Sequence, residues 1–195
     1  MGKQIHLEKI KRLFDKSPVV DFKSIERIIG VSKKSSYAKL LIYNLIKNGK
    51  IKKVGKGVYT KHSESSLSVF AFKPSYLGLQ SALSFYGIWE QETIPIILTT
   101  KKVRVGLRSV MNSNILLRNI DKKHFFGFLL QKENGFYLPY SDLEKTLIDM
   151  VVFNQKISKE VIFEIRKKIN RDRLNEYLKR YGKNIRNRVL EISNI

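Results

Sequence analysis

The spacing of apolar residues in the first third of the chain predicts three short amphipathic helices. The first spans residues 4–16, the second follows Asp21, which is a good N-cap, and the third spans about 33–48. Ser32 is a typical capping residue for the third helix, and Gly49 provides its stop. The inward faces are formed by apolar residues three and four positions apart: Leu7, Ile10, Leu13 and Phe14 in the first helix, Ile25, Ile28 and Ile29 in the second, and Ala38, Leu41, Ile42 and Leu45 in the third.

A short basic hairpin is predicted after the third helix. Its strands are residues 50–54 and 58–61, and Gly55-Lys56-Gly57 between them supplies the glycines that a tight turn needs. Two helices joined by a short turn and followed by such a hairpin are the layout of a winged helix-turn-helix, which binds DNA. We therefore expect residues 1–62 to form a winged helix-turn-helix domain.

The face of the third helix opposite its apolar stripe is predicted to read DNA. Ser and Tyr hydroxyls can bond base edges or phosphates, and Lys can meet guanine acceptors or phosphates. The lysines of the hairpin are expected to hold phosphates, which positions the protein without specifying a sequence. The predicted DNA-binding residues are Lys33, Lys34, Ser35, Ser36, Tyr37, Lys39 and Tyr43 in the helix and Lys52, Lys53 and Lys56 in the hairpin.

Positive charge is concentrated in the same region. Residues 1–62 contain 16 Lys and Arg and 4 Asp and Glu, a net of +12, whereas residues 63–195 contain 22 and 13, a net of +9. Such a field attracts polyanions and makes binding salt-dependent. Charge alone does not separate DNA from RNA, but a recognition helix fits the wide major groove of B-DNA and not the narrow one of A-form RNA. The alternative is a three-helix module whose solvated lysine face contacts protein.

The pattern changes after the polar stretch HSESSLS at residues 62–68, which predicts a domain boundary. The second domain, residues 69–195, is expected to contain a small, mostly antiparallel sheet and several helices, so the fold class is α+β. Its predicted strands are 94–100, 114–120, 125–132 and 136–138, with a hairpin turn at Asn134-Gly135, and its predicted helices are 74–86, 141–153, 158–169, 171–181 and 183–192.

Composition excludes several kinds of site. The chain has no Cys, which rules out disulfides, thiolate metal sites and cysteine nucleophiles. It has no run of about eighteen apolar residues and no hydrophobic signal region, so we expect a soluble, cytoplasmic protein without a membrane partner. His6, His62 and His124 are scattered and no phosphate-binding glycine loop is present, so we expect neither a metal nor a cofactor.

Three carboxylates close together in the second domain are the candidates for catalysis. Asp142, Glu144 and Asp149 could hold a metal or act as acid and base. A structural interpretation is favoured, because Ser141 and Glu144 fit an S-x-x-E capping box and Asp142 suits the positive start of a helix. Glu144 is also expected to lie beside Lys145 on an ordinary exposed polar face of this helix. Lys145 and Asp149 could form a partly buried ion pair that orients helices. We expect no enzymatic activity.

Three motifs follow one another in the second domain: an S-A-L-x-x-x-G helix with Ser81, Ala82, Leu83 and Gly87, a strand ending in Thr99 and Thr100, and an E-K-x-x-x-D helix with Glu144, Lys145 and Asp149. Their order behind the predicted winged helix-turn-helix resembles the antitoxin and transcriptional-regulator proteins of the abortive-infection AbiE type. The resemblance spans about residues 20–155.

The resemblance implies the antitoxin of a type IV toxin–antitoxin pair. In that family the N-terminal domain binds repeats in its own promoter, and the C-terminal domain counters a nucleotidyltransferase-like toxin. The expected function is a sequence-specific DNA-binding transcriptional regulator, acting as a monomer or homodimer on inverted repeats in double-stranded DNA. Two alternatives stay open: a basic RNA-associated or structural nucleic-acid-binding protein, and a non-catalytic DNA-docking subunit of a nucleic-acid enzyme.

Overall fold

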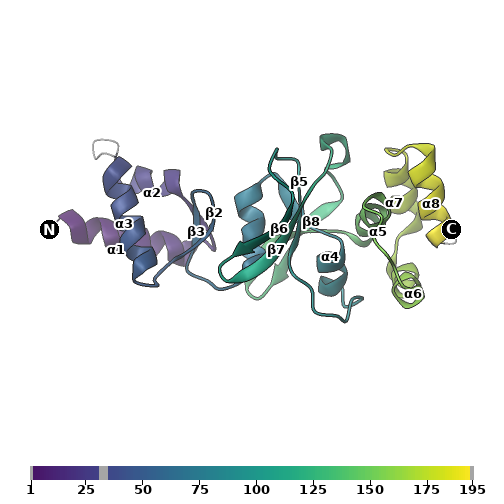
Figure 1. The fold of residues 1–195 in the computed structure, drawn as a ribbon, viewed down its shortest axis with the longest axis horizontal. Helices are drawn as coiled ribbons and strands as arrows, with labels where there is room; N and C mark the ends of the chain where they lie inside the picture. Colours follow the sequence, from purple (N-terminus) through teal and green to yellow (C-terminus); the bar gives the residue numbers. More distant parts are fainter. Residues whose placement is uncertain (1, 31–34, 194–195) are drawn as a thin grey trace. The chain divides into compact units, whose positions relative to one another are not determined.

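The computed structural model describes residues 2–30 and 35–193 of the chain, and these divide into two compact units (Figure 1). The first unit comprises the described residues up to Phe72 together with Ser109–Asn114. The second comprises Lys73–Arg108 and the described residues from Ile115 onwards. The fold class is α+β, with a small antiparallel sheet and a larger mixed sheet.

The first unit contains three α-helices and three short strands within the described residues. In chain order they are α1 (Gly2–Lys16), β1 (Val20–Asp21), α2 (Phe22–Ile29), α3 (Ser35–Lys47), β2 (Lys52–Gly55) and β3 (Val58–Thr60), followed by the 3-10 helix η1 (Ser65–Phe72). The strand order is β1-β3-β2, and both pairings are antiparallel. The three predicted helices and the hairpin are confirmed, although the expected cap of α3 at Ser32 lies outside the described residues.

The core of the first unit is built from the predicted apolar faces. Of the residues expected to face inward, Leu7, Leu13, Ile28 and Leu41 are half-buried and the others are buried. Asp21 caps α2 as predicted, because its Oδ1 accepts a hydrogen bond of 2.8 Å from Ser24 N. Since Phe22 N also donates to Gly57 O at 2.8 Å, the start of α2 is held against the hairpin turn.

Strand β1 was not predicted. It pairs only Val20 with Tyr59 and Asp21 with Val58, and two residues are too few to show an alternating pattern. It nevertheless matters for the arrangement, because it joins the segment before α2 to β3 of the hairpin.

The second unit is organised around a six-stranded sheet with the order β6-β7-β5-β4-β9-β8, of which the β6–β7 residues Ser109–Asn114 are assigned to the first unit. Its strands are β4 (Ser75–Leu77), β5 (Ile96–Thr99), β6 (Gly106–Val110), β7 (Ser113–Asn119), β8 (Phe128–Glu133) and β9 (Phe136–Ser141). The β4–β9 and β5–β7 pairings are parallel. The sheet is therefore mixed: the expected antiparallel pairing is present between β4 and β5 and between β8 and β9, but not in these two pairs. The reason is that pairing between strands distant in sequence, such as Leu77 with Tyr140, is set by tertiary packing and not by local spacing.

The predicted helix 74–86 is wrong in its first half. Ser75–Leu77 forms the buried strand β4, and α4 spans only Gln80–Phe85. Leu79 has a φ of 55°, which a helix does not allow. A Cβ added at Gly78 would lie 2.7 Å from Leu98 Cδ1, so the backbone at Gly78 packs directly against the Leu98 side chain of β5. A short apolar run does not reveal by periodicity whether it is strand or helix.

Four helices follow the sheet at the C-terminal end of the second unit (Figure 1). They are α5 (Leu143–Val152), α6 (Lys159–Lys168), α7 (Arg171–Leu178) and α8 (Lys183–Ser193). The four helices predicted there are confirmed; the first three are shorter than predicted and α8 is one residue longer. Helix α5 packs against α4, α6, α7 and α8, and residues 143–151 are buried all round it. The predicted Asn134-Gly135 turn joins β8 to β9, with both residues at positive φ. The strand predicted at residues 125–132 begins only at Phe128 in the structure. A short 3-10 helix, η2 (Lys122–His124), precedes it.

No helix in residues 2–30 or 35–193 is long and apolar enough to cross a membrane.

The hairpin of the first unit leaves no room for a side chain at Gly55. A Cβ there would overlap the Cβ of Ala71 in η1. We expect Gly55→Ala to lower the free energy of unfolding by about 1–3 kcal/mol, because the overlap forces backbone movement. Urea unfolding followed by far-UV circular dichroism measures this. Gly182→Ala is the control, since nothing lies within 4 Å of its added Cβ, and equal stability of the two variants would contradict the close approach.

Candidate nucleic-acid interface

The solvent-exposed face of α3 contains both polar and apolar side chains. Ala38, Ile42 and Leu45 are buried, whereas Ser35, Ser36 and Lys39 are exposed, as their predicted role requires. The side chains of Leu40 and Tyr43 are 54% and 60% exposed. The sequence prediction included Tyr43 and missed Leu40, an apolar residue directly before Leu41 of the predicted inward face. Apolar groups on such a face can contact thymine methyl groups, so the mixture suits base edges in a major groove.

Tyr37 differs from its neighbours on α3. It is half-buried and packs against the core of the first unit, with its ring 6.3 Å from the His6 ring in an edge-to-face arrangement. The expectation that Tyr37 points away from the core is therefore wrong. At 3.6 residues per turn, Tyr37 lies next to the buried stripe at Ala38, and its large ring leans onto it. Lys33 and Lys34, the other predicted contacts at this end, lie outside the described residues.

The hairpin presents the predicted lysines. Lys52, Lys53 and Lys56 are exposed, while Val54 between them is fully buried and anchors β2. Lys52 Nζ donates to Ser63 Oγ at 2.8 Å. Gly57 has a φ of 69°, which the turn requires and which places Lys56 at its tip.

Hydrogen bonds hold α3 and the hairpin in a fixed relation. Lys50 N donates to Leu45 O at 2.9 Å, so the chain leaves α3 in a tight turn. Ile51 is buried in the same core as Ile42. Strand β3 then returns to pair with β1. The two elements are therefore one rigid surface within the first unit.

That surface contains no acidic residue. Between Glu26 and Glu64 the chain has nine Lys, one Arg and neither Asp nor Glu. Glu8 of α1 pairs with Lys11 of the same helix at 3.0 Å, and Asp15 pairs at 2.6 Å with Lys61, the last lysine of this interval, which follows β3. Residues 27–63 therefore give α3 and the hairpin a positive field that no acidic side chain on these two elements cancels. Such a field is the electrostatic footprint of a polyanion site.

A second polar cluster is buried in the second unit around α5. Lys145 Nζ contacts Asp149 Oδ1, and both side chains are fully buried. The Tyr76 hydroxyl donates to Asp149 Oδ2 at 2.7 Å. Burial lowers the pKa of Lys145 and raises that of Asp149, and the contact between them opposes both shifts. The ion pair suggested by the sequence is present, and it is completely buried rather than partly so.

The other candidate carboxylates have structural partners too. Asp142 caps α5 through Lys145 N at 2.8 Å and accepts from the Tyr177 hydroxyl at 2.8 Å. Glu144 accepts from Asn170 N at 2.6 Å. The predicted capping box is wrong, because Ser141 belongs to β9 and Glu144 reaches the start of α7 instead of its own helix start. The expected exposed polar face of α5 does not exist, since Glu144 is 3% exposed.

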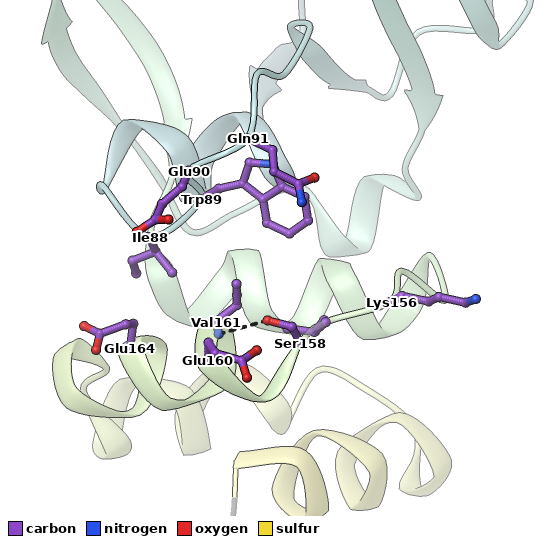
Figure 2. Close-up of a pocket in the computed structure, with 10 residues that line it drawn as sticks. Ile88, Trp89, Glu90, Gln91, Lys156, Ser158, Glu160, Val161 and Glu164 are labelled. Atoms are coloured by element: carbon purple, nitrogen blue, oxygen red, sulfur yellow. Dashed lines mark hydrogen bonds between the residues drawn. The ribbon is translucent and has the colours of Figure 1, made fainter.

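A pocket of about 570 Å³ lies between residues 88–91 and the start of α6 (Figure 2). Trp89 lines the pocket from the segment 88–91. Val161, Glu160 and Glu164 line it from α6, so the lining is both apolar and acidic. Its polar groups serve α6: Ser158 Oγ accepts from Val161 N at 3.3 Å, and Glu164 pairs with Lys167 at 2.7 Å. Acidic side chains at the beginning of a helix stabilise its positive end. The pocket lining offers no nucleophile paired with a base.

Within residues 2–30 and 35–193, no group of three or more His, Asp or Glu is placed to hold a metal ion.

Comparisons with known proteins give the fold alone. No protein-family model and no curated protein matches the chain. Among solved structures, it is similar to the crystal structure of the RV2827C protein from Mycobacterium tuberculosis, with a TM-score of 0.62 and 13% identity over 96% of this chain and 74% of that one. The similarity extends over nearly the whole chain, so an α+β arrangement of this kind also occurs in a distant sequence.

Proposed function

We propose that the first unit is a winged helix-turn-helix that binds double-stranded DNA, and that the protein is a transcriptional regulator. The observation that carries the proposal is the acid-free basic surface made by α3 and the β2–β3 hairpin. The element order α1-β1-α2-α3-β2-β3 and the strand order β1-β3-β2 support it, because they leave one helix and one hairpin free to meet the same duplex.

In this proposal α3 and the β2–β3 hairpin contact different parts of the DNA. Ser35, Ser36 and Lys39 on α3 contact base edges in the major groove, with Leu40 and Tyr43 beside them. The hairpin lysines hold phosphates of the adjacent backbone. Tyr37 has no direct role, because its packing on the core removes it from the contact face.

The proposal that the regulator is the antitoxin of an AbiE-like pair rests on the three motifs of the second unit. Their polar residues support the fold: Ser81 Oγ accepts from Ile96 N at 2.7 Å, Thr99 Oγ1 donates to Pro74 O at 2.9 Å, and Lys145 contacts Asp149. The motifs thus join α4, β5 and α5 into one core. This is a reason for them to occur together, and in this proposal a surface for a nucleotidyltransferase-like toxin lies elsewhere on the second unit.

The test is a fluorescence-anisotropy titration with two duplexes of equal length and composition, one from the region upstream of the gene and one shuffled. We expect tighter binding of the upstream duplex, and a duplex RNA of the same sequence to bind more weakly. Equal affinity for the two DNA duplexes would favour the alternative of a general nucleic-acid-binding protein.

Ser36→Ala is expected to reduce discrimination between these duplexes by about 1–3 kcal/mol, because a base contact is lost while phosphate contacts remain. The ratio of the two dissociation constants measures it. Ser17→Ala is a matched control, since the Ser17 hydroxyl donates to Val19 O before β1 and lies outside the proposed contact elements. An unchanged ratio in Ser36→Ala would show that Ser36 does not read bases.

A further inference from the structure

Strand β8 is an unprotected edge of the large sheet. It is the terminal strand of the six, and its pairing with β9 is regular over six residue pairs from Phe128–Ser141 to Glu133–Phe136. Its outer backbone N–H and C=O groups therefore form a row that no other strand of residues 2–30 and 35–193 pairs with, which is a template for another strand.

Large apolar side chains accompany this edge. Leu129 and Leu130 are 57% and 65% exposed, and successive residues of a strand point to opposite faces, so each face of the edge carries one. Tyr137 is 61% exposed and lies on the Leu130 face, because it is paired with Lys132. Proteins usually guard an edge with charge, proline or a bulge. Strand β8 has no proline or register shift, and its two charges lie at its end.

The opposite edge of the sheet is guarded in the usual way. Strand β6 is shorter and carries Arg108 in its middle, with Lys101, Lys102 and Arg104 just before it. Of the two edges of this sheet, β8 is the one that combines a regular edge with apolar side chains on both faces.

Local charge indicates what covers β8. The chain has a net charge of +21, so two copies repel one another over most of their surface. Residues 128–141 are an exception, because they contain one Lys and one Glu and are neutral. A neutral strip with exposed leucines is where two copies of such a chain can approach.

We propose that β8 pairs antiparallel with β8 of a second copy about a two-fold axis, which joins the two sheets. A two-fold axis perpendicular to the sheet keeps both copies of a residue on the same face, so the axis passes through a residue that pairs with itself. With Leu130 at the axis, Leu130 lies opposite the second Leu130, Leu129 opposite Gln131 and Phe128 opposite Lys132 of the other copy. No like charges face each other in this register. The two Leu130 side chains meet on one face, and on the other face Leu129 lies diagonal to the second Leu129, within reach of its side chain. The strand is thus its own complement.

Such a dimer carries two copies of the first unit related by two-fold symmetry. If the first unit binds DNA as proposed above, the dimer matches the symmetry of an inverted repeat. The dimer itself does not depend on that function, so its test contains no DNA.

Sedimentation equilibrium of the full chain tests the proposal. In the wild type we expect a mass of about 46 kDa, twice the 22.8 kDa of one chain. Leu130→Lys places new positive charges at the two-fold axis and is expected to raise the dimer dissociation constant about 100-fold. Leu129→Lys does the same from the other face. Leu107→Lys on β6 is the control, since Leu107 is 63% exposed at the other edge, and it is expected to remain dimeric.

Circular dichroism spectra establish that each variant is folded. A wild-type monomer at 100 µM, or a dimer that both Leu129→Lys and Leu130→Lys leave intact, overturns the proposal. The second outcome would place the contact between copies on another surface.

Discussion

Replacing Lys145 with Met is expected to lower the free energy of unfolding of the second unit by about 3–5 kcal/mol, because it leaves the Asp149 carboxylate buried without its countercharge. Both side chains are fully buried, and α5 is covered by four other helices. Met keeps most of the length of the lysine stem, so the loss reflects charge more than volume. Urea unfolding followed by the fluorescence of Trp89, the single Trp of the chain, reports on this unit.

The loss of unfolding free energy in Lys145→Met should depend on pH. Burial raises the pKa of Asp149, and in Lys145→Met no cation opposes that shift. A carboxyl group whose folded pKa is raised above its unfolded value, near 3.9, favours the fold when it is protonated. That stability is present below the unfolded pKa and is lost as pH rises through the folded pKa. The deficit of Lys145→Met relative to the wild type should therefore be larger at pH 7.5 than at pH 4.5.

Two further variants separate charge from packing. Lys145→Met combined with Asp149→Asn removes both charges and keeps an acceptor for the Tyr76 hydroxyl, so it should recover most of the loss. Lys167→Met breaks the exposed pair with Glu164 and should change stability by no more than about 0.5–1 kcal/mol. A pH-independent deficit in Lys145→Met would mean that Asp149 is neutral in the wild type as well.

The second large effect is expected on DNA affinity when Lys53 and Lys56 are both replaced by Ala. Both are exposed on the hairpin, and each phosphate contact that is lost flattens the slope of log K against log salt by about 0.9. The double variant should therefore weaken binding to upstream and shuffled duplexes alike and reduce the slope by roughly one to two units. Titrations between about 50 and 200 mM salt measure it.

The control removes the same charge from α1. Lys9 and Lys16 are exposed there, and Lys9→Ala with Lys16→Ala should leave the salt slope nearly unchanged. If both double variants flatten the slope equally, the protein responds to net charge alone and the hairpin has no special place in the contact.

The local structure of the first unit followed from its sequence because each signal there is local. Apolar spacing gave the helices, and Asp21 caps α2 in the expected way. The exposure of Tyr37 did not follow, since a residue at the border of a helical stripe is placed by what its ring can reach. Leu40 was missed for the opposite reason: an apolar residue beside the stripe reads as core until packing shows it outside.

The second unit was harder to predict because its determinants are not local. Ser75–Leu77 becomes a strand because β5 and β9 flank it, and neither partner is visible in its own spacing. The carboxylates of α5 read as an exposed polar face because charged residues are seldom buried. Their partners, Tyr76, Tyr177 and Asn170, come from segments distant in sequence. The ion pair between Lys145 and Asp149 was foreseen because it needs only a spacing of four residues on one helix.

Mapping the contact surface directly is the decisive measurement. In ¹H–¹⁵N correlation spectra of the full chain, addition of a duplex from the upstream region should shift amide signals of Ser35–Lys47 and Lys52–Thr60 and leave those of α5–α8 largely in place. Amide shifts confined to the second unit, or none at saturating DNA, would contradict the assignment of α3 and the hairpin as the DNA-binding surface.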